Sequence, residues 1–332
     1  MNSILLVHLG EYVPPYLRDC VHQIRLWNPP EDLDIFIVLE PCHSGKDFWI
    51  ELIAKYNVRL VYTNELEPTA EHTAFLKGYV GDTDFRKGYW RHVKERFFYM
   101  EEVIRTFGLG PIVAMEYDIL LYAHVKELLV RLLEHSPRQL AMVMDNEERG
   151  HPGFLFIPSA AAIQRFNAFI VEMICSNLED MKLLAEFRKT NCESGVKCLP
   201  IITSRRNKTI PTRFARNGLS CANPEFLSEG FETIGFLFDS LCVGQMIGGI
   251  DPRNVGGKYT IGYENESALY SVREMDLTWK KEGGLWRPIL DNVPLATIHM
   301  HSKGLQYFLS DRDEVKMTEI GLEIVSKGLQ PN

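Results

Sequence analysis

Two acidic residues spaced by one, Glu116 and Asp118, are the residues of this chain whose type and spacing most clearly suggest chemistry. The apolar run 111–115 leads into them, and it is short and follows a Gly-rich breaker, so it predicts a buried strand. Side chains alternate along a strand, so we expect both carboxylates on one face and Tyr117 on the other. Such a pair is explained if a cation lies between the acids, or if each binds a different polar part of one ligand. A strand turning out into solvent with two hydrated acids is the alternative.

A second group of polar residues, His299, His301 and Lys303, lies at the end of the predicted late strand 295–299. If the strand continues, all three side chains share one face. Imidazole beside carboxylate suits a divalent cation such as manganese, and a lysine would neutralise phosphate oxygens. The two groups together indicate a site for a divalent metal bound to a diphosphate, which would stabilise charge on a departing nucleoside diphosphate. The alternative is a polar strand end with one hydrogen-bonded histidine.

The elements that must position these residues alternate between strand and helix in the first half of the chain. Periodicity predicts strands over 3–9, 34–40 and 58–62, and helices over 14–27, 47–56 and 86–107. This alternation favours a parallel sheet covered by helices on both faces. The polar connection 64–85 is long enough to be a functional lid or binding segment.

The second half is less regular. Strands are predicted over 140–144, 153–157 and 295–299, and helices over 124–135, 159–176, 239–247 and 312–326. The stretch 190–235 is rich in Asn, Ser, Gly, Pro and Arg, and its pattern assigns no element. We find no repeat and no linker, so one compact unit with two halves is expected.

Composition excludes several classes of protein. The chain has 332 residues, of which 45% are hydrophobic and 24% charged, as in ordinary globular proteins. Its net charge of -8 argues against broad binding to nucleic acid or an anionic membrane. No apolar stretch approaches the roughly 18 residues that span a bilayer, and the N-terminus lacks the pattern of a signal peptide. Seven scattered cysteines without a Cys-x-x-Cys pair favour reduced thiols, so we expect a cytoplasmic protein.

Glu116-Tyr117-Asp118 resembles the Asp-x-Asp motif of the A-type (GT-A fold) glycosyltransferases, the nucleotide-diphospho-sugar transferases, in which it ends a strand after a nucleotide-binding α/β unit. The resemblance implies a Rossmann-type α/β sandwich, with a mostly parallel central sheet, helices on both faces and an irregular acceptor-side lobe. It implies that 1–122 form the nucleotide-sugar-binding half. Residues 123–332 then form the acceptor-binding half, with the metal and diphosphate segment near the C-terminus.

The same resemblance implies roles for particular residues. Asp118 is the expected ligand of Mn²⁺ or Mg²⁺. Glu116 replaces the usual aspartate, so its contact with metal, ribose or sugar stays open. His299 or His301 would complete the metal shell, and Lys303 would contact the diphosphate. The segment 153–158 would line the acceptor side. The loop after the first strand would cradle the nucleobase with His8, Gly10, Glu11 and Tyr12.

Other candidates come from the residues themselves. Arg91 and Arg96, on the helix before the motif, could contact a phosphate or the sugar, or could form a solvated helix face. An inverting transferase needs a base near the acceptor hydroxyl. We favour Asp239 because it lies among apolar residues where an unpaired acid is costly, and a helix N-cap is the alternative. The other candidate bases are Asp145, Glu229 and Glu232. A basic patch of Arg205, Arg206, Arg213 and Arg216 could recognise an acidic acceptor, or could be a surface loop.

The expected function is therefore a metal-dependent glycosyltransferase that moves a sugar from a nucleoside-diphosphate donor, with a UDP-sugar expected, to a hydroxyl of a glycan or other acceptor. A nucleotidyltransferase is less favoured, because the segment 8–15 has one Gly and no Lys or Arg to hold a triphosphate. A non-catalytic nucleotide- or glycan-binding protein of the same fold remains an alternative. A glycoside hydrolase fits poorly, because the two carboxylates of such an enzyme lie roughly 5–9 Å apart across the sugar. Two acids spaced by one residue on a single strand match this arrangement poorly.

Overall fold

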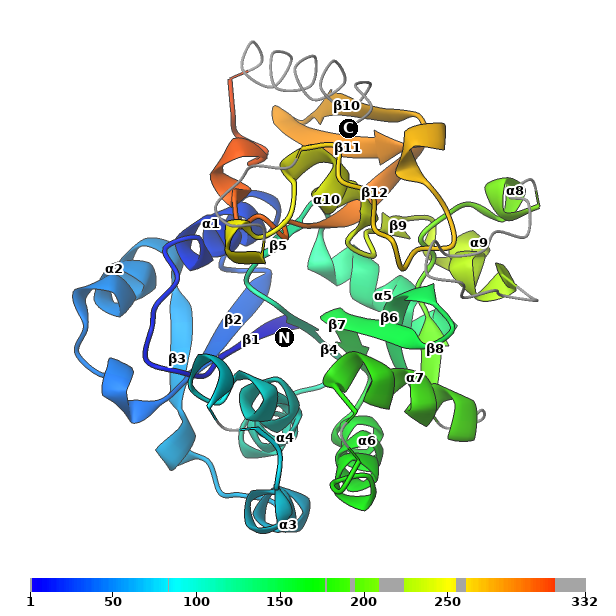
Figure 1. Ribbon diagram of the computed structural model, residues 1–332. Helices are drawn as coiled ribbons and strands as arrows, with labels where there is room; N and C mark the ends of the chain where they lie inside the picture. Colours follow the sequence, from blue (N-terminus) through cyan, green and yellow to red (C-terminus); the bar gives the residue numbers. More distant parts are fainter. Residues whose placement is uncertain are drawn as a thin grey trace.

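The computed structural model describes residues 2–82, 84–176, 178–191, 195–208, 224–254 and 261–313. Within these ranges, strands form two sheets with helices packed around them (Figure 1). The helices are α1 (Leu17–Trp27), α2 (Asp47–Tyr56), α3 (Ala70–Gly78), α4 (Tyr89–Phe107), α5 (Val125–His135), α6 (Ala160–Glu172), α7 (Asp180–Thr190), α8 (Ser204–Asn207), α9 (Phe231–Ile234) and α10 (Cys242–Gly248).

The larger sheet contains seven strands among the described residues, in the spatial order β3-β2-β1-β4-β7-β6-β8. Their bounds are β1 (Asn2–His8), β2 (Leu33–Leu39), β3 (Val58–Tyr62), β4 (Ile112–Met115), β6 (Leu140–Asn146), β7 (Arg149–Ile157) and β8 (Val196–Cys198). The β3–β2, β2–β1, β1–β4 and β6–β8 pairs are parallel, and β7 runs antiparallel to both β4 and β6. The prediction of an α/β protein with a mostly parallel central sheet is confirmed.

Helices cover both faces of this sheet. Figure 1 shows α3, α4, α6 and α7 on one side of the row of strands, and α1 and α5 on the other. The strands between them are apolar on both faces, as β1 shows with its fully buried Ile4, Leu5 and Leu6. Because parallel strands place their carboxyl ends at the same sheet edge, β1, β2 and β4 deliver the loops that follow them to one place.

Helix α4 leads the chain into β4 and has a glycine at each boundary. Gly88 precedes the helix and Gly108 follows it, both in the left-handed region, at φ 90° and φ 58°. Phe97, Met100 and Ile104 lie on its buried face, as their helical spacing predicts.

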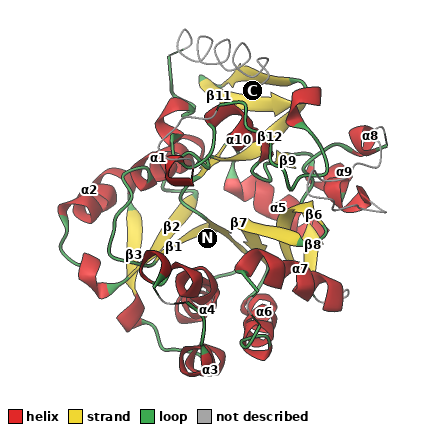
Figure 2. Ribbon diagram, in the orientation of Figure 1, coloured by secondary structure: helices red, strands yellow, loops and turns green. Residues whose placement is uncertain are grey.

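The smaller sheet pairs a strand that follows the acidic pair with strands nearer the C-terminus. Its strands are β5 (Ile119–Leu121), β9 (Leu237–Phe238), β10 (Leu277–Glu282), β11 (Leu285–Leu290) and β12 (Val293–His299). Figure 2 shows β9, β11 and β12 above the larger sheet. β12 pairs antiparallel with β5, so that His299 lies opposite Ile119. This register places the late histidine beside the residue that directly follows the acidic pair. The division into halves at residue 122 stays a prediction.

Two expectations about local structure are wrong. The strand that begins at 112 does not continue through the acidic pair: β4 ends at Met115, the chain turns at 116–118, and β5 pairs with β12 in the smaller sheet. The polar connection 64–85 contains α3, whose start is capped by the Thr69 side chain accepting from the His72 backbone N–H. Only two residues of α3 are buried, His72 and Phe75, so its sequence carries little amphipathic signal.

The remaining predicted elements are present with shifts of a few residues at their ends, apart from the helix over 312–326, which lies outside the described residues from 314 onward. Among the helices that the structure describes, none has the length and apolar character needed to cross a membrane. The five described cysteines are unpaired, as the scattered spacing predicts.

Candidate metal centre

Three side chains from distant parts of the sequence meet at the edge where the two sheets join. Glu116, Asp118 and His299 each offer one ligand atom, and these atoms lie within 4.8 Å of one another. The His299 Nε2 atom is 3.2 Å from Asp118 Oδ2 and 3.7 Å from Glu116 Oε2. Two carboxylates and an imidazole suit Mn²⁺ or Mg²⁺ chemistry.

Two backbone hydrogen bonds fix this geometry, one to β7 and one to the residue after β12. The Glu116 N–H donates to the Gly153 carbonyl at 2.8 Å, and the Met300 N–H donates to the Asp118 carbonyl at 2.8 Å. The turn at 116–118, and not strand alternation, therefore brings the two carboxylates together. Gly153 passes so close that an added Cβ would lie 3.1 Å from His299 Nδ1 and 3.3 Å from Glu116 Oε2. A side chain on β7 at this position would push into the group of acids.

One carboxylate oxygen of Asp118 contacts two basic side chains, Lys303 and His299. Asp118 Oδ2 forms an ion pair with the Lys303 ammonium and lies beside His299. Burial alone would raise the pKa of Asp118, but Lys303 and His299 outweigh it and hold the pKa well below its usual value. The pKa of His299 is raised, because Asp118 more than offsets the burial that lowers it. Asp118 Oδ1 is buried and has no hydrogen-bond partner in the described part of the chain. A bound cation would satisfy that oxygen, so the residues present fit a metal.

Glu116 has its own cation, Arg96 of α4. One terminal nitrogen of Arg96 pairs with Glu116, and the other donates to Asp180 Oδ2 at 2.7 Å. The Arg96 side chain is 12% exposed, so it lies mostly out of solvent beside Glu116 and not on a solvated helix face. Asp180, the first residue of α7, is a site residue that sequence reasoning missed. An acid in the first turn of a helix is common, so its sequence position carries no signal for a site.

The loop after β1 lies next to the motif. His8 is buried at the end of β1, and its Nδ1 atom lies 3.2 Å from the Tyr117 hydroxyl. Burial, with a smaller contribution from His43, lowers the pKa of His8 to about 4, so the ring is neutral. Gly10 takes φ +101°, and its N–H donates to Glu40, the residue after β2. Tyr12 is 73% exposed and available to a ligand. The nucleobase role of these residues stays a prediction.

Two predicted site residues lie apart from the ligand group. His301 is the second residue after β12, and its Nδ1 atom accepts from the Asp251 backbone N–H at 3.2 Å. Asp239 uses both carboxylate oxygens, accepting from the Val243, Gly244 and His299 N–H groups at 2.8, 2.9 and 3.0 Å. Asp239 therefore ties the start of α10 to the end of β12. Burial raises its pKa although the three backbone donors oppose the shift.

Asp145, the other predicted base, lies on β6 in a separate buried group. Its Oδ2 atom is 3.1 Å from His151 Nε2 and 3.0 Å from Asn265 Nδ2. Burial would raise its pKa, but His151 and Arg149 outweigh it and lower the pKa. His151 precedes Gly153 by two residues on β7. The roles of Asp239 and Asp145 in catalysis stay predictions.

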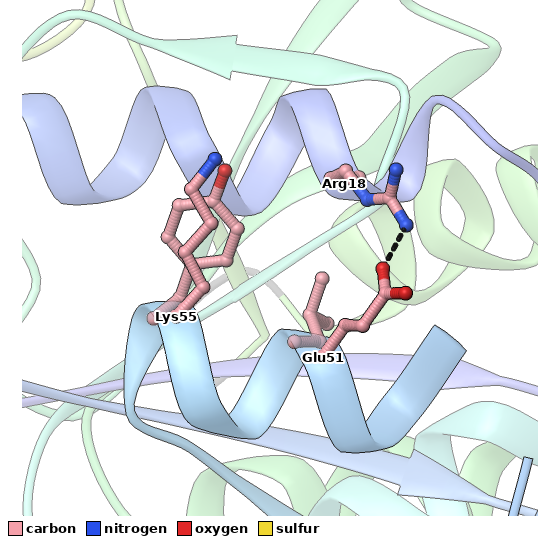
Figure 3. A pocket seen from close by; sticks show the side chains of 5 residues that line it. Arg18, Glu51 and Lys55 are labelled. Carbon is pink, nitrogen blue, oxygen red and sulfur yellow. Dashed lines mark hydrogen bonds and ion pairs between the residues drawn. The ribbon is translucent and has the colours of Figure 1, made fainter. Parts of the chain in front are cut away.

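The basic patch does not gather at this site within the described residues. Arg206 pairs with Asp291 at 2.8 Å, and Arg213 and Arg216 lie outside the described residues. A small cavity of about 120 Å³ lies between α1 and α2, lined by Arg18, Glu51, Leu52, Lys55 and Tyr56 (Figure 3). An ion pair of 2.7 Å between Arg18 and Glu51 borders it. The cavity is too small for a nucleotide sugar, since ligand pockets usually reach about 300–1,000 Å³.

Comparisons with known proteins give similar structures but no sequence relatives. No protein-family model matches the chain, and no curated protein matches it. The structure of mouse xyloside xylosyltransferase 1 is similar with a TM-score of 0.42 and 9% identity, over 62% of this chain and 89% of that one. The galactosyltransferase LgtC, solved with donor and acceptor sugar analogues, is similar with a TM-score of 0.46 and 11% identity, over 69% and 82%. A cytidylyltransferase from Leptospira borgpetersenii is similar with a TM-score of 0.33 and 10% identity, over 59% and 74%. These similarities, at identities of 9–11%, assign no function to the chain.

Proposed function

We propose that this protein is a metal-dependent glycosyltransferase that uses a nucleoside-diphosphate sugar, with a UDP-sugar as the expected donor, and transfers the sugar to a hydroxyl of a glycan or other acceptor. The convergence of Glu116, Asp118 and His299 at the carboxyl end of β4 carries this proposal. In open α/β sheets, ligands bind beyond the carboxyl ends of the strands.

Asp118, Glu116 and His299 would hold Mn²⁺ or Mg²⁺, which when bound stabilises the charge that develops on the departing nucleoside diphosphate. Lys303 lies beside Asp118 and is placed to neutralise phosphate oxygens. His8 ends β1 beside Tyr117, and Gly10 and Tyr12 follow it in the loop where a nucleoside would bind. Arg96 pairs with both Glu116 and Asp180, and together they would orient the donor sugar.

A thermal-shift screen of nucleoside diphosphates and nucleotide sugars, with and without Mn²⁺, tests the proposal. Ligand at a hundred times its Kd stabilises the folded state by about 2.7 kcal/mol, so a selective, metal-dependent rise in Tm is expected with one base. The Asp118→Asn variant should lose this rise while remaining folded. The absence of a shift with every nucleotide would refute the proposal. Nucleotide binding without hydrolysis or transfer of any donor sugar would instead indicate a binding protein.

A further inference from the structure

Lys303 and Asp118 show an arrangement that goes beyond donor binding. The Lys303 ammonium pairs with the Asp118 oxygen that also faces His299, so a side-chain cation already contacts the three-ligand group. The two side chains are only 21% and 9% exposed, so water screens this pair weakly. An ion pair of this kind competes with a metal for the negative charge of the Asp118 carboxylate.

The acids around the group already have side-chain cations as partners without a metal. Arg96 is shared between Glu116 and Asp180. Lys303 pairs with Asp118. A divalent ion entering alone would place two further positive charges beside these two cations. A nucleoside diphosphate reverses the balance, because its phosphate oxygens offer Lys303 another partner.

The position of Lys303 suits a side chain that changes partners. Its backbone is in the left-handed region at φ 66°, and its N–H donates to the Met300 carbonyl at 2.8 Å, so a tight turn fixes its Cα directly after β12. Its ammonium also lies 5.9 Å from the ring centroid of Tyr16, in the loop that follows β1. The flexible stem of a lysine can therefore reach toward either the Asp118 carboxylate or the loop after β1.

We propose that Lys303 is an internal cation that holds the metal site closed until a nucleoside diphosphate draws it away, so that metal and nucleotide bind cooperatively. This inference rests on the proposed function, because it takes Glu116, Asp118 and His299 as the metal ligands. Coupling of this kind is reciprocal, so Mn²⁺ must tighten diphosphate binding by the same factor.

Electron paramagnetic resonance of free Mn²⁺ tests the inference without any turnover. We expect weak Mn²⁺ binding to the wild-type protein alone and binding about ten-fold tighter when UDP is present. Lys303→Met keeps the stem and removes the charge, so it should tighten Mn²⁺ binding in the absence of UDP by a similar factor and reduce the effect of UDP. Lys303→Arg keeps the charge and should leave Mn²⁺ binding weak without UDP.

The matched control is Lys77→Met, which makes the same charge change at an exposed position on α3 and should bind Mn²⁺ like the wild type. Equal Mn²⁺ affinity of the wild type and Lys303→Met without UDP would overturn this inference and leave the proposed function intact. Absence of Mn²⁺ binding to every variant, with and without UDP, would instead overturn the proposed function. Circular dichroism melts establish that each variant is folded, and Lys303→Gln replaces Lys303→Met if the latter is not.

Discussion

Arg96 donates to Asp180 at 2.7 Å while its other terminal nitrogen pairs with Glu116, so one guanidinium bridges two acids from different parts of the chain. The planar fork of arginine suits this double contact, and a lysine could not reproduce it. Through Glu116, this bridge connects α4 and α7 to the candidate metal centre. Its loss should therefore affect both stability and the site.

Arg96→Met should be strongly destabilising, because it leaves Glu116 and Asp180 without their shared cation. Removing one partner of a buried ionic group typically costs about 3–5 kcal/mol. Burial raises the pKa of Asp180 in spite of Arg96, and loss of Arg96 raises it further. Protonation of Asp180 then relieves its repulsion with Glu116, so the loss of stability should be smaller at pH 5 than at pH 7. Urea denaturation at both pH values measures this.

Arg96→Met/Asp180→Asn provides the control for that prediction. With one of the two acids neutralised, the double variant should recover part of the stability that the single variant loses. If the double variant were less stable by the full sum of the two single losses, Arg96 and Asp180 would not be coupled.

The two histidines near the end of β12 should differ sharply in their effect on metal binding. His299→Gln should abolish Mn²⁺ binding, because His299 lies 3.2 Å from Asp118 Oδ2. His301→Gln should keep most of it, because the His301 ring accepts from the Asp251 backbone instead. Titration of Mn²⁺ in the presence of UDP compares the two variants. Loss of Mn²⁺ binding in the His301 variant alone would show that His301, and not His299, is the metal ligand.

The sequence predicts the parallel sheet and its helices well, because alternating apolar runs and breaker residues determine local structure. Alternation also identified Glu116 and Asp118 as a pair, but for a reason that the structure corrects. A turn between two sheets brings the carboxylates together, and that turn depends on the pairing of β5 with β12, a contact between residues far apart in sequence. Local periodicity contains no information on such pairing.

The choice between His299 and His301 could not be made from sequence for a related reason. Strand alternation predicts the same face for His299 and His301. In the structure they differ because β12 ends at His299, so His301 lies beyond the strand. Asp180 was missed because the first turn of any helix favours acids. The role of Asp180 depends on its contact with Arg96, and the sequence position of Asp180 does not indicate that contact. Residues that act through a distant partner are therefore the ones that a single sequence leaves unidentified.

A buried histidine on α3 predicts a pH dependence of stability. His72 lies between Glu102, 2.7 Å from its Nδ1 atom, and Glu95, 3.5 Å from its Nε2 atom. Tyr99 and Phe98 of α4 pack against the ring, and Arg91 pairs with Glu95. Burial lowers the pKa of His72, but the two glutamates outweigh it and raise the pKa to about 9.

A raised histidine pKa stabilises the folded state fully below the unfolded value of about 6.5, and that stability is lost as pH rises through about 9. The contribution is on the order of 3 kcal/mol. The pKa of Glu95 is lowered, since His72 and Arg91 outweigh its burial, so its contribution is lost as pH falls through that lowered value. Unfolding free energies at pH 6 and pH 9.5 should differ less in His72→Gln than in the wild type. An equal difference in both would show that His72 does not titrate in this way.

Asp239→Asn separates a positioning role from a catalytic one. The carboxylate accepts three backbone N–H groups, including that of His299, so an amide would turn a donor toward a donor. A buried donor left unpaired costs about 1–3 kcal/mol. We therefore expect Asp239→Asn to lower stability and Mn²⁺ affinity together, because the end of β12 moves.

Asp145→Asn is the matched control, since the hydrogen bonds and ion pairs of that carboxylate are to the side chains of His151, Arg149 and Asn265. It should leave Mn²⁺ affinity unchanged. If Asp239→Asn kept its stability and metal affinity but lost sugar transfer, Asp239 would be the catalytic base that its apolar surroundings suggested.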